Sequence, residues 1–189
     1  MEDRKVTISR LKAKIEYPAS FMLVAASNPC PCGYYGEGDR CTCTPGQRAG
    51  YLSKLSGPIM DRIDIQIWVH PVETSALVRG GKAEASADIA RRVLKAREIQ
   101  QKRFAGSGIF TNAEMSSKQL EAFCPLDEAC KELLERLIDK LGLSARAYTR
   151  IIKIARTIAD LSDSPAIRPE HLAEAASYRF LDRRNVLDL

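Results

Sequence analysis

The sequence predicts a partial α/β core followed by an all-helical bundle. Residues 1–75 contain alternating and apolar runs that are typical of β-strands, together with a cysteine-rich loop. Beyond Gly80 and Gly81, apolar residues recur at the spacing of amphipathic helices. We therefore expect a core domain over residues 1–75, a linker over 76–85 and a helical domain over 86–189.

The composition is that of a globular protein. Hydrophobic residues make up 45% and charged residues 28% of the 189, which argues against disorder. No apolar run approaches the roughly 20 residues of a membrane span, and the first residues lack the apolar segment of a signal peptide. We therefore expect a cytoplasmic protein with no membrane partner. The net charge of +5 permits nucleic-acid binding without demonstrating it.

The first part of the chain predicts a hairpin and then a buried strand. Residues 6–10 and 13–17 alternate apolar and polar side chains, as the two strands of a β-hairpin do. The continuous apolar run Phe21–Ala26 is typical of a central strand that is covered on both faces. Asn28 would then emerge at the carboxyl end of this strand, where ligands bind in open α/β sheets.

Helices dominate the predicted structure from the cysteine loop onward. Thr44 and Pro45 are a suitable N-cap and first residue for a helix over 47–55, and a second sheet strand is predicted over 63–69. The predicted helices of the second part span residues 87–104, 116–123, 126–141, 144–161 and 169–181.

The α/β part is too small to be complete. Roughly 70 residues with a hairpin and two sheet strands cannot cover both faces of a central strand. The sequence also lacks a Gly-x-x-x-x-Gly-Lys-[Ser/Thr] loop, which would cradle the phosphates of a nucleotide. We therefore expect the chain to be a fragment whose first half lies upstream of Met1.

Four cysteines form a candidate metal site. Cys30 and Cys32 make one Cys-x-Cys pair, and Cys41 and Cys43 make another eight residues later. Four thiolates from two short turns suit tetrahedral Zn²⁺, and an all-cysteine ligand set leaves no open position, so the zinc would be structural. The alternative is a glycine-rich loop with reduced, free thiols. Cys124 and Cys130 are expected to be small buried hydrophobic residues instead.

Several motifs together resemble a known ATPase family. The segments 26–36, 41–45, 51–64 and 144–161 are similar to the magnesium-chelatase-like AAA+ ATPases of the YifB/ComM family. The resemblance covers nearly the whole chain but only the back half of a family member. It implies a partial AAA+ core with a helical lid, ATP and Mg²⁺ as cofactors, and a ring-shaped homo-oligomer, expected to be a hexamer. The family's Walker A and B motifs would lie upstream, so we expect no ATP hydrolysis by this chain alone.

The resemblance also assigns roles to individual residues. Asn28 matches the sensor-1 position, which orients the attacking water, and Arg62 matches the arginine finger. Arg146 matches sensor 2 on the lid, with Arg150 one turn later as the alternative candidate. The residues by themselves also allow simpler interpretations: a turn-forming Asn28, an Arg62 that is paired with neighbouring aspartates, and a solvated Arg146.

A basic hairpin is the candidate DNA-binding element. Arg10, Lys12 and Lys14 lie on the predicted hairpin, which corresponds to the pre-sensor-1 hairpin that faces the pore in ring-shaped relatives. These cations could follow a phosphate backbone, and a solvated surface explains them equally well.

Three functions fit these observations. The first is part of an ATP-driven DNA motor of the branch-migration or helicase type, in which Asn28 and Arg146 act on their own subunit's nucleotide and Arg62 on a neighbour's. The second is a magnesium chelatase-type subunit that drives metal insertion into a porphyrin. The third is a non-enzymatic, zinc-stabilised interaction module.

Overall fold

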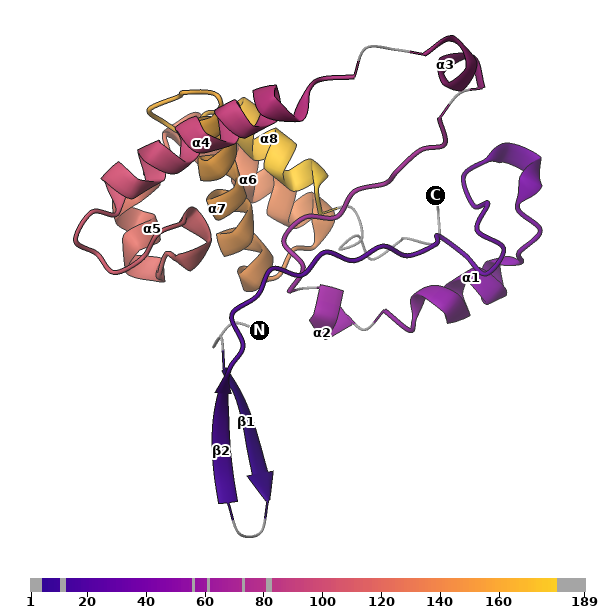
Figure 1. The fold of residues 1–189 in the computed structure, drawn as a ribbon, viewed down its shortest axis with the longest axis horizontal. Helices are drawn as coiled ribbons and strands as arrows, with labels where there is room; N and C mark the ends of the chain where they lie inside the picture. The colour runs from indigo at the N-terminus through magenta and orange to yellow at the C-terminus, as the bar shows by residue number, and fades with distance from the viewer. Residues whose placement is uncertain are drawn as a thin grey trace. The chain divides into compact units, whose positions relative to one another are not determined.

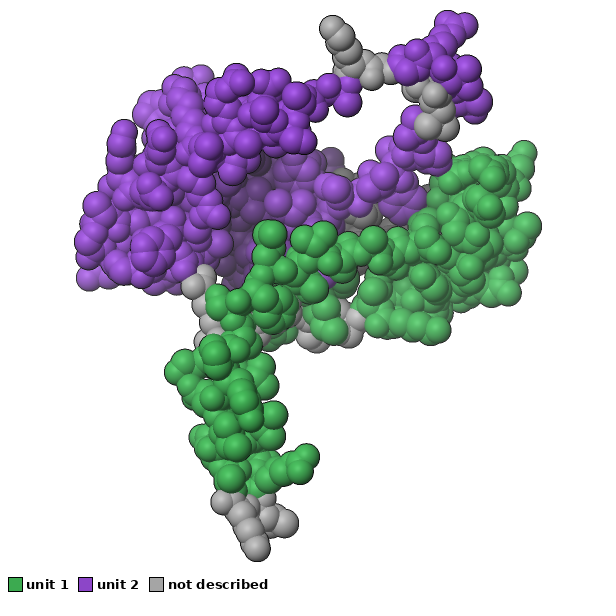
Figure 2. All heavy atoms as spheres, in the orientation of Figure 1, with its two compact units in different colours: residues 1–62, 189 green, residues 63–188 purple. Residues whose placement is uncertain are grey.

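The computed structural model describes residues 5–10, 13–55, 57–60, 62–72, 74–80 and 83–179. Over these residues the chain divides into two compact units, residues 1–62 and residues 63–188, which Figure 2 colours separately. Each unit has its own local architecture.

The first unit begins with the predicted β-hairpin. Strand β1 (Lys5–Arg10) pairs antiparallel with β2 (Ala13–Pro18), and Figure 1 shows them side by side. Val6 lies opposite Tyr17 and Ile8 lies opposite Ile15. Directly opposed residues share a face of the sheet, so these apolar side chains line one face of the hairpin. All four remain exposed to solvent.

The predicted strand over Phe21–Ala26 is wrong. These residues form no regular secondary structure, and their apolar side chains are exposed, Val24 to 83%. A strand exists only when its N–H and C=O groups pair with a neighbouring strand, and among the described residues none pairs with this run. The apolar composition of this run thus indicates β-propensity, but it does not specify a neighbouring strand for the run to pair with.

Short helices follow the cysteine loop. A single 3₁₀ turn, η1 (Gly38–Arg40), lies within the loop, and α1 (Pro45–Leu52) follows it. Thr44 caps α1 by accepting a hydrogen bond from the Gln47 N–H, and the Gln47 side chain accepts one from the Thr44 N–H. This capping box confirms Thr44 as the N-cap and Pro45 as the first helical residue, whereas the helix ends at Leu52 rather than at residue 55. Helix α2 (Gly57–Met60) is one turn long.

The second unit starts with an extended segment instead of the predicted strand. Residues 63–69 form no ladder, so that prediction is also wrong. The Gln66 N–H instead donates to the Tyr178 carbonyl (2.8 Å), so a backbone group satisfies it without a sheet. Helix α3 (Thr74–Arg79) then lies inside the glycine-containing stretch for which no helix was predicted.

The predicted helical bundle is confirmed. Figure 1 shows α4 to α8 packed together. The elements are α4 (Ser86–Arg103), η2 (Asn112–Glu114), α5 (Ser117–Phe123), α6 (Glu128–Leu141), α7 (Ala145–Leu161) and α8 (Pro169–Ser177). Ser144 caps α7 by accepting from the Ala147 N–H, as the sequence predicted. The last helix was predicted to run to residue 181, but it ends at Ser177, and Tyr178 is its C-cap. Residues 180 and 181 lie outside the described residues.

The bundle has a continuous hydrophobic core. Helix α7 lies at its centre and packs against α4, α5, α8 and the η2 turn. The fully buried side chains include Ile151 and Ile152 of α7 and Leu172 of α8. Cys124 and Cys130 are buried in the same core, which confirms that they behave as small hydrophobic residues. No helix within the described residues combines the length and the apolar character needed to cross a membrane.

Candidate functional site

The structure brings the four predicted cysteine ligands together. The sulfur atoms of Cys30, Cys32, Cys41 and Cys43 all lie within 4.8 Å of one another, and none of these cysteines forms a disulfide. The Sγ of Cys41 lies 3.8 Å from that of Cys30 and 3.7 Å from that of Cys32. A tetrahedral Zn²⁺ with Zn–S bonds of about 2.3 Å requires sulfurs about 3.8 Å apart. The two distances to Cys41 match this separation, the Cys30–Cys32 distance of 3.3 Å is shorter, and the donor set is that of a structural zinc site.

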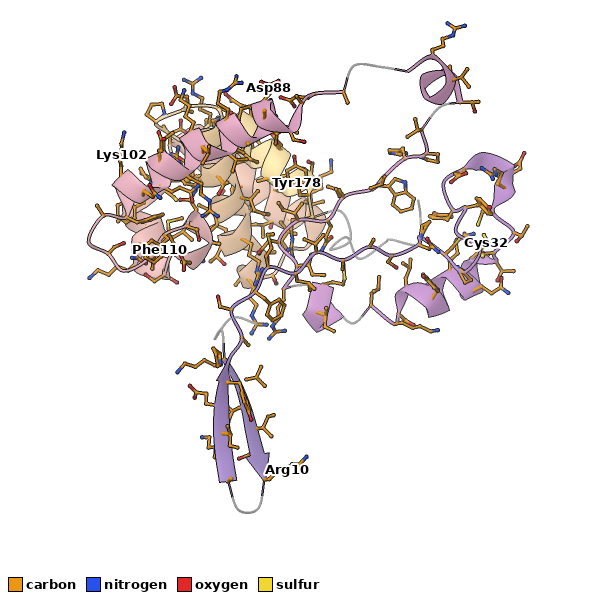
Figure 3. All side chains as sticks on the ribbon, in the orientation of Figure 1. Arg10, Cys32, Asp88, Lys102, Phe110 and Tyr178 are labelled. Atoms are coloured by element: carbon orange, nitrogen blue, oxygen red, sulfur yellow. The ribbon has the colours of Figure 1, made fainter. Side chains whose placement is uncertain are left out.

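Two glycines turn the chain so that the second cysteine pair meets the first. Gly33 has φ +85° and Gly36 has φ +92°, a region that other residues seldom adopt. The Gly33 N–H donates to the Cys30 carbonyl (3.0 Å), which closes the first turn. Figure 3 shows Cys32 in this loop beside α1. The local backbone geometry thus brings together sulfurs that are separated by eight residues of sequence.

Arginine–tyrosine pairs support the loop from outside. The Arg48 guanidinium of α1 lies 4.7 Å from the centre of the Tyr35 ring and donates to the Cys43 carbonyl (2.8 Å). Arg40 lies 4.3 Å from the centre of the Tyr34 ring. These contacts attach α1 to the cysteine loop, so ligation of the sulfurs would also order the helix.

The thiols of Cys32 and Cys43 have pKa values shifted in opposite directions. The Tyr34 N–H donates to the Cys32 sulfur and lowers the pKa of this thiol to about 6. A backbone hydrogen bond also favours the Cys43 thiolate, but burial and the neighbouring sulfurs outweigh it and raise the pKa of Cys43 to about 11. Four adjacent thiols resist joint deprotonation because each negative charge opposes the next. A bound divalent cation would remove this repulsion, as expected for a metal site.

Asn28 and Arg62 lie in the same unit as the cysteines. Asn28 is exposed just before the cysteine loop, and a Cβ at Gly33 would lie 3.9 Å from its side-chain amide. Arg62 is partly buried at the turn after α2, where its N–H donates to the Ile59 carbonyl (2.9 Å). Their assignment as sensor 1 and arginine finger stays a prediction.

The structure separates the two sensor-2 candidates. Arg146 is exposed in the first turn of α7. Arg150, one turn later, forms an ion pair with Asp64, and its side chain is only 15% exposed. No local pattern predicts this pairing, because the partners are 86 residues apart. Both arginines belong to the unit of residues 63–188, whereas Asn28 and Arg62 belong to the unit of residues 1–62.

The hairpin cations are divided between two faces. Arg10 pairs with Ala13 across the strands and Ser9 pairs with Lys14, so Arg10 and Lys14 point to opposite faces. Both are exposed, and Figure 3 shows Arg10 close to the hairpin tip. Lys12, the remaining predicted DNA contact, lies outside the described residues.

Sequence reasoning missed a buried ionic network in the bundle. The Asp160 carboxylate, 1% exposed, accepts hydrogen bonds from Arg103 (2.5 and 2.7 Å), Asn112 (2.8 Å) and Arg156 (3.1 Å). Burial alone would raise the pKa of Asp160, but these hydrogen bonds and the two guanidinium charges lower it overall. The available signal was that Arg156 and Asp160 are four residues apart on the apolar face of their helix.

Comparisons with known proteins identify the family. The model "Magnesium chelatase, subunit ChlI" matches residues 1–77, and "Magnesium chelatase, subunit ChlI C-terminal" matches residues 83–179. The chain belongs to the magnesium chelatase-like family that includes ComM and YifB. Asn28, Arg62 and the four cysteines fall in the first match, and Arg146 and Arg150 in the second.

Relatives in this magnesium chelatase-like family are longer proteins. The chain is 45% identical to the competence protein ComM of Haemophilus influenzae over 184 residues. It is 44% identical over 186 residues to YifB of Escherichia coli, and 33% identical over 179 residues to an uncharacterized protein of Mycobacterium tuberculosis. Each alignment covers 95% or more of this chain and 35% of the relative. The chain therefore spans about a third of the length of these relatives.

Proposed function

We propose that this chain is the C-terminal part of an ATP-driven motor that acts on DNA in the cytoplasm. The observation that carries this proposal is the 45% identity, over 97% of the chain, to a protein named competence protein ComM. The basic residues Arg10 and Lys14 of the exposed hairpin support it, because phosphate contacts from lysine and arginine give DNA affinity without sequence selection. The motor would move along or remodel branched DNA.

The nucleotide site would be shared between two subunits of a ring, which we propose to be a hexamer. Asn28 would orient the water that attacks the γ-phosphate, and the exposed Arg146 would contact the nucleotide of its own subunit. Arg62 would reach the nucleotide of the neighbour and neutralise the charge that develops on the transferred phosphoryl group. Residues of the longer protein outside this chain would hold Mg²⁺, which would supply charge neutralisation at the phosphates. This chain alone would then hydrolyse no ATP.

The cysteine loop would hold one structural Zn²⁺. The spacing of the described sulfurs supports a tetrahedral site, and four cysteines leave no position open for a substrate. The metal would keep the loop and α1 together and would take no part in hydrolysis.

The test measures ATP hydrolysis by the longer protein that contains this chain. The reactions contain four-way-junction DNA, protoporphyrin with magnesium, or neither, and they compare wild type with Arg62→Ala and with Arg97→Ala, an exposed arginine of α4. We expect branched DNA to stimulate hydrolysis, Arg62→Ala to reduce kcat by about a thousandfold or more, and Arg97→Ala to have no effect. Stimulation that survives Arg62→Ala would contradict the arginine-finger assignment.

The same experiment separates the alternatives. The descriptions of both matching family models name a magnesium chelatase subunit. This supports a second candidate function, an ATPase that drives metal insertion into a porphyrin. Stimulation by protoporphyrin with magnesium and indifference to DNA would favour that function. No hydrolysis under any condition would leave the third candidate, a zinc-stabilised interaction module.

A further inference from the structure

The segment that follows Arg62 is attached to the helical bundle. The Arg179 side chain is fully buried, and its Nη1 donates to the Ile63 carbonyl (2.6 Å). The Gln66 N–H donates to the Tyr178 carbonyl (2.8 Å), and the Gln66 residue is itself buried. Between these two anchor points, Asp64 forms its ion pair with Arg150 of α7. Residues 63–66 thus contact α7 and the turn that follows α8.

The ion pair sets the orientation of the segment between its backbone anchors. The Asp64 side chain is 55% exposed, whereas the Arg150 side chain is 15% exposed. A half-exposed pair contributes little stability by itself, but it fixes which side of the segment faces α7. The ion pair therefore directs the Nη1 of Arg150 at Asp64. Arg146, one turn earlier on α7, is exposed.

We propose that Arg150 is a positioning residue that, through Asp64, fastens residues 63–66 to the bundle and so holds the backbone directly behind Arg62. This inference rests on the proposed ATPase function, in which Arg62 serves a neighbouring subunit. It assigns nucleotide contact on α7 to Arg146. The bundle thereby holds Ile63, the residue that follows Arg62 in the sequence.

The attachment itself is tested in the 189-residue chain. The variants are Arg150→Glu, the exchanged pair Asp64→Arg with Arg150→Glu, and Arg136→Glu as a matched control on an exposed position of α6. Hydrogen exchange at the Gln66 amide should accelerate about fivefold in Arg150→Glu, the factor expected for loss of a weak ion pair. Acrylamide quenching of Trp68, the single tryptophan, should rise in parallel. The exchanged pair should restore both values, and Arg136→Glu should change neither.

The positioning role is tested in the longer protein by separating KM from kcat. We expect Arg150→Glu to lower kcat with an unchanged KM for ATP, and the exchanged pair to recover most of the loss. A raised KM that the exchanged pair does not recover would make Arg150 a nucleotide ligand and overturn the inference. Unaltered exchange at Gln66 would overturn it as well. Absence of ATPase activity in wild type would instead refute the proposed function and the positioning role with it. The hydrogen-exchange measurement would still show whether Arg150 attaches residues 63–66 to the bundle.

Discussion

The two units of this chain are ordered by different means. Residues 63–188 contain a hydrophobic core around α7, with fully buried residues such as Ile151 and Leu172. Among the described residues of 1–62, Cys30 is the single buried side chain. One unit is therefore stabilised by the burial of apolar surface, and the other by hairpin pairing, tight turns and a cluster of sulfurs.

The difference shows which unit is self-sufficient. The first unit exposes the four consecutive apolar residues Phe21 to Val24, with Met22 exposed to 88%. A contiguous apolar surface of this kind is typical of a region that packs against another protein surface. The bundle buries its own apolar side chains, so substitutions and metal removal should affect the two units unequally.

Loss of the metal should have the largest effect, and it should be confined to the first unit. We expect wild type to bind about one Zn²⁺ per chain and Cys30→Ser to lose it, because the substitution removes one of the four ligands. The effect on the first unit should be large, since structural zinc supplies about 10 kcal/mol or more of folding free energy. Residues 30–52 should then become sensitive to proteases, while the unfolding temperature of the bundle stays unchanged. Zinc content and limited proteolysis measure this.

Cys130→Ser is the matched control for the metal experiment. Cys130 is buried in the bundle and donates to the Ile167 carbonyl (3.6 Å). This variant should retain its zinc and lose stability only in the bundle. Full zinc content in Cys30→Ser would show that the sulfur cluster is not the metal site.

Removal of the buried charge Asp160 should be the largest single-residue effect on the bundle. Asp160→Asn leaves Arg103 and Arg156 buried without a counter-charge, so the free energy of unfolding should fall by about 3–5 kcal/mol in urea titrations. Asp163→Asn removes the exposed partner of Lys95 and should cost less than about 1 kcal/mol. Equal effects at the two positions would mean that the network contributes no more than a surface pair.

Replacing a leucine by alanine should have different effects on stability in the two units. Leu172→Ala removes a fully buried side chain of α8, so the free energy of unfolding should fall by about 2–5 kcal/mol. Leu23→Ala removes a side chain that is 48% exposed and should change the stability of either unit by about 0.5 kcal/mol or less. Urea unfolding followed by circular dichroism measures both. A comparable loss from Leu23→Ala would reveal a core in the first unit.

Acidic pH should lower the stability of the bundle through protonation of Asp160, and the loss should be smaller than that caused by Asp160→Asn. The pKa of Asp160 is lowered in the folded state, so the unfolded state binds its proton more readily. The resulting stability is fully present above the unfolded pKa of about 3.9 and is lost as the pH falls through the folded pKa. Unfolding titrations across acidic pH should show a steeper decline in wild type than in Asp160→Asn. Identical slopes would exclude this linkage.

The helices of the bundle were predictable because their signals are local. Ser144 caps α7 as expected, and the apolar spacing placed α6 within two residues of its observed limits. The strands over 21–26 and 63–69 were not predictable, because a strand depends on a partner that its own sequence does not specify. Hairpin strands β1 and β2 are the exception, since each supplies the other's partner a few residues away.

The contacts of the candidate site likewise divide into those that local sequence predicts and those that join distant residues. The grouping of the four cysteines followed from short spacings within residues 30–43, and the structure confirmed it. The pairing of Arg150 with Asp64 joins residues 86 apart, and nothing in the local sequence of either residue indicates it. The Asp160 network likewise draws on three separate elements, α4, η2 and α7.

The cysteine loop has a consequence for the order in which this chain acquires structure. All four sulfurs, the turns between them and the arginine–tyrosine pairs come from residues 30–48, so the loop has very low contact order. During synthesis this segment leaves the ribosome before any helix of the bundle exists. With zinc at hand it can fold as soon as Arg48 emerges, whereas the bundle must wait for α8 near the end of the described chain.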